Sequence, residues 1–120
     1  MPNSNCILII EDDLSIREFM GSFLDDEGYC YVTAENGQEA LQLIKTMQPG
    51  LIILDMFMPV LDGKGFLAAY QNVPGPHAPI IGMSANVPAL EPEFKNNLQD
   101  FINKPFHLDT LLERVKEYLD

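Results

Sequence analysis

Residues 51–55 read Leu-Ile-Ile-Leu-Asp, so four apolar residues in a row run directly into a carboxylate. Branched apolar side chains favour an extended chain, and an unbroken apolar run is typical of a strand covered on both faces. Strands of that kind occur in parallel sheets. The stretch therefore predicts a buried parallel strand, and Asp55 stands where this strand reaches a polar edge.

The rest of the chain repeats this plan of a short apolar run followed by a helical pattern. Asp13 and Asp62 stand where they can cap two of the helices, and Gly28 can end the first. The proline-rich stretch 74–79 predicts a loop, and the two prolines within 86–97 predict a short or distorted helix. The strands are predicted over residues 6–10, 29–34, 51–54, 80–83 and 101–103.

Five such strand-helix units predict one α/β domain over residues 1–120. Its sheet should be open, parallel and doubly wound, with helices on both faces. In such sheets ligands bind at the carboxyl ends of the strands.

The composition describes a globular and strongly acidic chain. Acidic residues outnumber basic ones by 18 to 7, which gives a formal net charge of -11. This charge repels nucleic-acid phosphates and anionic lipids, so we expect no direct nucleic-acid or membrane partner. No signal sequence is evident, and no apolar run approaches the roughly 20 residues of a membrane span. We therefore expect a cytoplasmic protein.

The two cysteines, Cys6 and Cys30, lie within predicted strands. Their spacing matches neither a disulfide-stapled secreted domain nor a CxxC metal site. We therefore expect reduced thiols in the core, which agrees with a cytoplasmic location.

Polar side chains stand at the carboxyl ends of four predicted strands: Glu11 and Asp12, then Asp55, Ser84 and Lys104. Because these ends meet at one edge of a parallel sheet, we expect the side chains to converge. Crowded carboxylates favour a hard cation such as Mg²⁺, which also accepts phosphate oxygens. Asp55 could then attack phosphorus to give an acyl phosphate, while Lys104 neutralises the transferred oxygens and Ser84 donates a hydrogen bond.

Each of these residues also has an ordinary structural explanation. Glu11-Asp12 could cap a helix, Asp55 could cap a loop, Ser84 could be a turn hydroxyl, and Lys104 could be a surface charge. Their joint occurrence at one predicted edge favours the chemical interpretation.

The residues around this set form a series of short motifs, which in chain order are Glu11-Asp12, Asp55 with Met58-Pro59 and Asp62-Gly63, Ser84-Ala85, and Lys104-Pro105-Phe106. Together they resemble the markers of the receiver domains of two-component response regulators, over nearly the whole chain. The resemblance implies a flavodoxin-like fold with strand order 2-1-3-4-5, a cis Lys104-Pro105 peptide bond, and a phosphorylation-controlled switch rather than an enzyme.

The resemblance also implies a role for each residue of the acidic pocket. Asp55 would accept a phosphoryl group from a histidine kinase or a histidine phosphotransfer protein. Mg²⁺ would be bound by Asp12, Asp55 and the backbone carbonyl of Phe57, with Glu11 acting through a metal-bound water. The bulky side chain of Phe57 predicts slow self-dephosphorylation, because it could shield the acyl phosphate from water.

Two further residues would carry the switch. Ser84 would move toward the phosphoryl group while Phe101, at the position of the family's switch aromatic, turns inward. This movement would alter the face formed by the helix expected over 86–97, the strand over 101–103 and the last helix, where an output partner or a second copy could bind. The prolines in 86–97, and Asn97-Leu98 where the family commonly has Gly-Ala, are departures from the family pattern in that face.

Two other functions compete with the switch, and a third is weaker. A Mg²⁺-dependent phosphohydrolase with an aspartyl nucleophile usually has a second Asp two residues later, where Phe57 stands here. A receiver-like binding module that works without phosphorylation would not need the intact set of pocket residues. A flavin- or nucleotide-binding domain is disfavoured because no glycine-rich phosphate loop follows the first strand.

His77 and His107 lack clustered partners, so we expect structural or surface roles for both.

Overall fold

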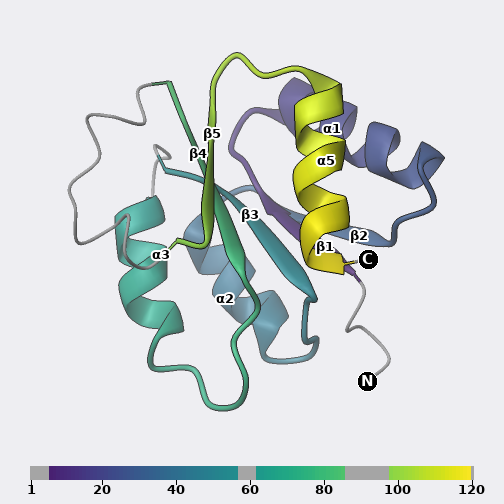
Figure 1. Ribbon diagram of the computed structural model, residues 1–120. Coiled ribbons are helices and arrows are strands. Elements are labelled where there is room, and N and C mark those ends of the chain that lie inside the picture. Colours follow the sequence, from purple (N-terminus) through teal and green to yellow (C-terminus); the bar gives the residue numbers. More distant parts are fainter. Residues whose placement is uncertain (1–5, 57–61, 86–97, 120) are drawn as a thin grey trace.

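A computed structural model describes residues 6–56, 62–85 and 98–119 of the chain. Five parallel strands form one sheet in the order β2-β1-β3-β4-β5 (Figure 1). This confirms the predicted parallel sheet and the strand order 2-1-3-4-5. The strands are β1 (Ile7–Ile10), β2 (Tyr31–Ala34), β3 (Leu51–Asp55), β4 (Ile80–Ser84) and β5 (Asp100–Asn103).

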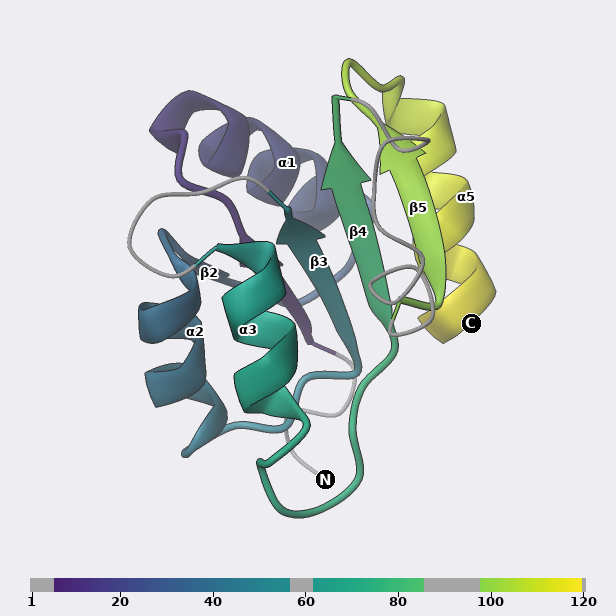
Figure 2. The same ribbon diagram turned by 90° about the vertical axis from the view of Figure 1, so that its left-hand side faces the viewer.

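Helices cover both faces of the sheet, as predicted for a doubly wound fold. Figure 2 shows α2 and α3 on one face, and α1 and α5 on the other. The helix expected over 86–97 lies outside the described residues. No helix in the described part of the chain is both long and apolar enough to cross a membrane. The helices are α1 (Leu14–Asp26), α2 (Gly37–Ile44), α3 (Gly63–Tyr70) and α5 (Leu108–Leu119).

The strands are apolar along their whole length because each face has its own core. In β1, Ile7 and Ile9 pack with α1 and α5, whereas Leu8 and Ile10 pack with α2 and α3. Successive side chains of a strand point to opposite faces, so a strand between two helical layers must be apolar at every position. All four side chains of β1 are fully buried.

The helix caps fix where each helix leaves the carboxyl edge of the sheet. Asp13 Oδ1 accepts a hydrogen bond from the backbone N–H of Ile16 at 3.1 Å, and Asp62 Oδ1 accepts one from Gly65 at 2.9 Å. Both caps were expected from the sequence, and Gly28 follows α1 with a φ of 91°. The α2 cap was not expected: Asn36 Oδ1 accepts a hydrogen bond from the N–H of Glu39 at 2.8 Å.

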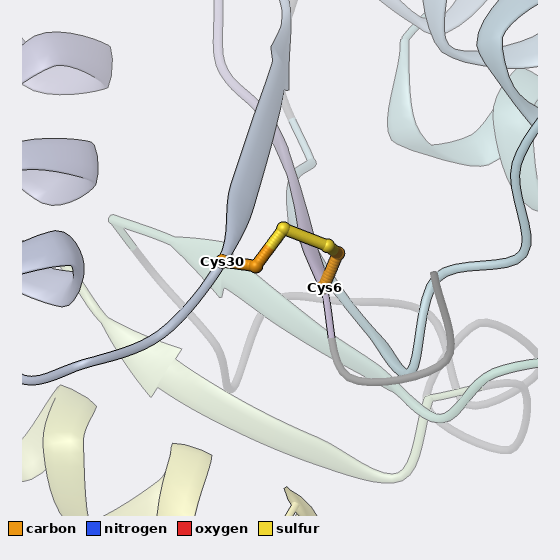
Figure 3. The surroundings of a disulfide bond; sticks show 2 residues. All are labelled: Cys6 and Cys30. Carbon is orange, nitrogen blue, oxygen red and sulfur yellow. A yellow bond between two sulfur atoms is a disulfide. The ribbon is translucent and has the colours of Figure 1, made fainter. Parts of the chain in front are cut away.

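The prediction of reduced thiols is wrong, because Cys6 and Cys30 form a disulfide bond (Figure 3). Each cysteine directly precedes its strand, and the register of the β1–β2 pair places Ile7 beside Tyr31. The residues one step earlier are therefore also neighbours, with their Cα atoms 4.5 Å apart, which is within the usual range for a disulfide. The sequence spacing of 24 residues gave no sign of this, since strand pairing rather than loop length brings the cysteines together.

Candidate functional site: an acidic pocket at the carboxyl edge of the sheet

Two neighbouring strands bring the three carboxylates together. Strands β1 and β3 pair so that Ile10 lies beside Leu54, which places Glu11 and Asp55 next to each other at the end of the ladder. Asp12 follows Glu11 in the turn toward α1. Carboxylate oxygens of Glu11, Asp12 and Asp55 lie within 4.8 Å of one another.

Lys104 reaches this cluster from the end of the edge strand β5. Its Nζ lies 2.9 Å from Glu11 Oε1 and 3.2 Å from Asp55 Oδ2. Its backbone N–H donates a hydrogen bond to the carbonyl of Ser84 at 2.8 Å, so the start of the loop after β5 is tied to the end of β4. The Lys104-Pro105 peptide bond is cis, which confirms the prediction.

Two of the three carboxylates are buried and the third is exposed. Glu11 is 1% exposed and Asp55 is 3% exposed, whereas Asp12 is exposed to solvent. When ionised, the three carboxylates carry three negative charges and the Lys104 ammonium carries one positive charge. Two of the negative charges are buried, where repulsion between them is poorly screened. The arrangement is therefore suited to receiving additional positive charge from solvent.

The pKa values of Glu11 and Lys104 reflect burial together with the charges of their neighbours. Burial raises the pKa of Glu11 to about 7, and a hydrogen bond and charge repulsion from Asp55 act in the same direction, while Lys104 opposes them. Burial by itself would lower the pKa of Lys104, but its ion pairs with Glu11 and Asp55 outweigh burial and raise that pKa above its ordinary value. Lys104 therefore stays charged at neutral pH, whereas Glu11 is divided between its two forms.

The other predicted site residues lie around the pocket or outside the described residues. Ser84 is the last residue of β4 and is 1% exposed. Phe101 in β5 is half-buried and packs against the core on the α2–α3 face. Phe57, for which we predict a metal contact and a shielding role, lies outside the described residues. Asn97 lies outside them as well.

Two hydrogen bonds to Glu11 were not foreseen from the sequence. The guanidinium of Arg17 donates a hydrogen bond from Nη1 to the carbonyl of Glu11 at 2.8 Å. The backbone N–H of Asp13 donates one to Glu11 Oε2 at 3.2 Å. Arg17 lies one helical turn after the cap residue Asp13, so it points back toward the end of β1. That spacing was the available signal, and it is a weak one because a basic residue in the first turn of a helix is usually a surface charge.

A close approach of two backbones also shapes the pocket. A Cβ atom added to Gly63 would lie 2.7 Å from the Cα of Met56, the residue that follows Asp55. Only a glycine therefore allows the start of α3 to pack this closely against the exit of β3. Gly63 belongs to the Asp62-Gly63 motif that the sequence analysis singled out, and the structure gives it a packing role.

The donor set fits a hard divalent cation. Mg²⁺ prefers oxygen ligands and is usually bound through one or two carboxylates while it keeps several waters. The cluster offers one exposed and two buried carboxylates, and the ammonium of Lys104 forms ion pairs with both buried ones. Three carboxylates beside one ammonium leave an excess of negative charge that a divalent cation would reduce. Glu11, Asp12 and Asp55 could each offer one carboxylate oxygen to such an ion.

Comparison with known proteins identifies the same family that the motifs indicate. The family described as response regulator receiver domain matches residues 7–116. Among curated proteins, response regulator MprA of Mycolicibacterium vanbaalenii is 33% identical over 115 residues, which cover 94% of this chain. They cover 49% of MprA, so the chain spans about half the length of this relative.

Solved structures agree with this assignment. Response regulator protein TrrA of Thermotoga maritima, solved in complex with Mg²⁺-BeF, matches with a TM-score of 0.82 and 31% identity over 96% of this chain and 99% of TrrA. A CheY-like receiver domain protein from Methanospirillum hungatei matches with a TM-score of 0.84 and 26% identity over 98% of this chain and 95% of that protein.

Proposed function

The chain belongs to the response regulator receiver domain family of two-component signalling, and we propose that it accepts a phosphoryl group on Asp55. The donor is a phosphorylated histidine of a histidine kinase or of a histidine phosphotransfer protein. The observation that carries the proposal is the buried Asp55 carboxylate, which lies 3.2 Å from the ammonium of Lys104 within the acidic cluster. The nucleophile and a cation for the transferred oxygens thus share one pocket.

Each pocket residue has a part in the transfer. A carboxylate oxygen of Asp55 attacks phosphorus, the bond from phosphorus to the donor imidazole breaks, and an acyl phosphate forms. Lys104 neutralises charge on the transferred oxygens, and the Ser84 hydroxyl donates a hydrogen bond to them. Asp12 and Asp55 would hold Mg²⁺ together with the backbone carbonyl of Phe57, and Glu11 would act through water. Bound Mg²⁺ supplies positive charge that stabilises the transferring phosphoryl group.

The phosphorylated domain acts as a conformational switch that passes the signal to an output partner or domain. Ser84 moves toward the phosphoryl group, and Phe101 turns further into the core that it already contacts. The surface that includes β5 and α5 changes as a result, and it is the surface that we assign to an output partner or to a second copy. The proposed partners, a histidine kinase or a histidine phosphotransfer protein, favour a cytoplasmic location.

The proposal is tested by intact mass after incubation with acetyl phosphate and Mg²⁺. We expect a single phosphoryl adduct that is absent from Asp55→Asn and absent when a chelator removes Mg²⁺. Asp25→Asn is the matched control, because Asp25 is an exposed acidic residue at the far end of α1 and should leave the adduct unchanged.

Other outcomes of this experiment point to the other two functions. A folded protein that forms no adduct with acetyl phosphate or with a phosphorylated histidine donor would be a phosphorylation-independent binding module. Multiple turnover on small phosphomonoesters would instead identify a phosphohydrolase.

A further inference from the structure

The disulfide lies at the end of the sheet opposite to the acidic pocket. Cys6 precedes β1, whose other end leads into Glu11, and Cys30 precedes the edge strand β2. No step of the proposed phosphoryl transfer uses this bond. It is nevertheless a chemically reactive group in a signalling domain, and it joins a central strand of the sheet to an edge strand (Figure 3).

We propose that the Cys6–Cys30 disulfide is a redox-exchange site, which a dithiol reductant opens in the folded protein through attack at Cys30. In a reducing cytoplasm, a disulfide of this kind is usually transient and redox-sensing rather than a permanent staple. The biological role of this exchange rests on the proposed cytoplasmic location. The exchange reaction itself depends only on how Cys6 and Cys30 are placed in the fold.

The two cysteines differ in their access to solvent. Cys30 is exposed, whereas Cys6 is 5% exposed and lies in the protein interior. Exchange requires a thiolate to approach one sulfur in line with the bond, so access selects which sulfur is attacked. Cys30 is therefore the site of the mixed disulfide, and Cys6 is the thiol that leaves and later re-forms the bond.

The exchange balances in two steps. A thiolate of the reductant attacks Cys30 Sγ, the Cys6–Cys30 bond breaks, and Cys6 leaves as a thiolate that takes a proton from water. The second thiol of the reductant then attacks its own sulfur in the mixed disulfide and releases Cys30. The protein gains two electrons and two protons, and the dithiol becomes a cyclic disulfide.

Backbone hydrogen bonds maintain the position of both cysteines independently of the bond between them. The N–H of Ile7 donates to the carbonyl of Cys30 at 2.9 Å, and the N–H of Gly50 donates to the carbonyl of Cys6 at 2.9 Å. Cys6 is thereby tied to the segment before β3, and Cys30 to the start of β1. After reduction the two thiols remain next to each other, so we infer that opening and closing are reversible without loss of the fold.

The first experiment measures how the rate of reduction depends on dithiol concentration in native buffer. We expect a rate that rises in proportion to dithiothreitol and is far above the rate of global unfolding. A rate that does not depend on dithiothreitol, and equals the unfolding rate, would mean that the bond opens only in the unfolded chain, and this would overturn the proposal. Two free thiols in protein purified and stored in air would overturn it as well.

The second experiment tests the asymmetry between the two cysteines. Cys6→Ser leaves the exposed Cys30 thiol, and Cys30→Ser leaves the buried Cys6 thiol. We expect iodoacetamide to label Cys6→Ser at least tenfold faster than Cys30→Ser, and glutathione disulfide to form its adduct on Cys30. Equal or reversed labelling rates would overturn the assignment of Cys30. Acetyl phosphate labelling of Asp55 is measured in parallel, so a failure of the redox proposal is distinguished from a failure of the proposed function.

Discussion

The two ends of strand β1 are stabilised in different ways. At its carboxyl end, the buried Glu11 depends on an ion pair with Lys104, which is 93 residues away in the sequence. At its amino end, Cys6 forms a covalent bond with Cys30, which is 24 residues away. The first end concentrates charge that the protein interior disfavours, whereas the second restricts the unfolded chain.

The two ends of β1 therefore differ in what they contribute. The acidic end carries the candidate reactive groups, and the disulfide end contributes to stability. Two buried carboxylates beside one ammonium add little to the free energy of unfolding, since apolar side chains of similar volume often give a protein that is at least as stable. The proposed phosphoryl transfer accounts for the acidic end better than a contribution to stability does. The disulfide end can add to the free energy of unfolding without disturbing the pocket, because the whole length of β1 lies between them.

The largest effect that we expect is on the acidic end, from Lys104→Met. The variant removes the ammonium from the pocket and keeps a side chain of similar length. We expect phosphorylation by acetyl phosphate to slow about a thousandfold, equivalent to about 4 kcal/mol of activation free energy, because the proposed function assigns to Lys104 the neutralisation of the transferred oxygens. Lys116→Met, at an exposed position of α5, is the control and should react like the wild type. A Lys104→Met variant that reacts at the normal rate would contradict the role of this ammonium.

The next effect concerns the covalent end. The Cys6→Ala/Cys30→Ala variant should lose about 3 kcal/mol of unfolding free energy relative to the oxidised wild type, because the bond no longer restricts the unfolded chain. This loss should lower the midpoint of thermal unfolding by about 10 °C. The same measurement on the wild type in dithiothreitol should reproduce the shift. If the reduced wild type and the variant unfold at the temperature of the oxidised protein, the bond does not stabilise the domain.

The contrast between the two ends also explains what could be foreseen from the sequence. The gathering of Glu11, Asp55 and Lys104 was predictable because the carboxyl ends of parallel strands meet at one edge, whatever the details of packing. The disulfide depends on the pairing of β1 with β2 in one register, and cysteine spacing alone does not show that register. Part of the signal was present, because the two cysteines lie in the strands predicted over 6–10 and 29–34, and these strands are neighbours in the expected order 2-1-3-4-5.

The helix caps show the same difference between features that depend on neighbouring residues and features that depend on packing. Asp13 and Asp62 were found because a cap depends on a few neighbouring residues. The hydrogen bond from Arg17 to the carbonyl of Glu11 was overlooked because it depends on the rotation of α1 relative to the sheet. The functional roles of the pocket residues stay predictions until the phosphorylation experiments are done.

The pH dependence of stability sharpens the comparison further. The pKa of Glu11 is about 7 in the folded protein against 4.5 for an ordinary glutamate. A raised folded-state pKa means that the folded protein binds the additional proton, so this contribution to stability is complete below pH 4.5 and disappears as the pH rises through 7. Without Mg²⁺, Glu11 should therefore lower the unfolding free energy between pH 5 and pH 8, by on the order of 2 kcal/mol.

The measurement compares wild type and Glu11→Gln by urea unfolding at several pH values in the presence of a chelator. Glu11→Gln removes the titration, so the stability difference between the two proteins should change with pH by the amount given above. The raised pKa of Lys104 predicts changes only in the alkaline range and does not interfere. A difference that stays constant from pH 5 to pH 8 would show that Glu11 titrates in its ordinary range.

The smallest effect is expected for Arg17→Met, which removes the hydrogen bond to the Glu11 carbonyl but keeps the apolar stem of the side chain. A single partly exposed hydrogen bond contributes about 1 kcal/mol to the unfolding free energy. Lys45→Met removes a side-chain hydrogen bond of an exposed residue on the other helical layer and should change stability by less. If Arg17 also positions Glu11, phosphorylation of Arg17→Met should slow severalfold while Lys45→Met reacts normally. A stability loss without a slower reaction would assign Arg17 to the fold alone, and it would mean that the acidic end of β1 tolerates small movements of Glu11.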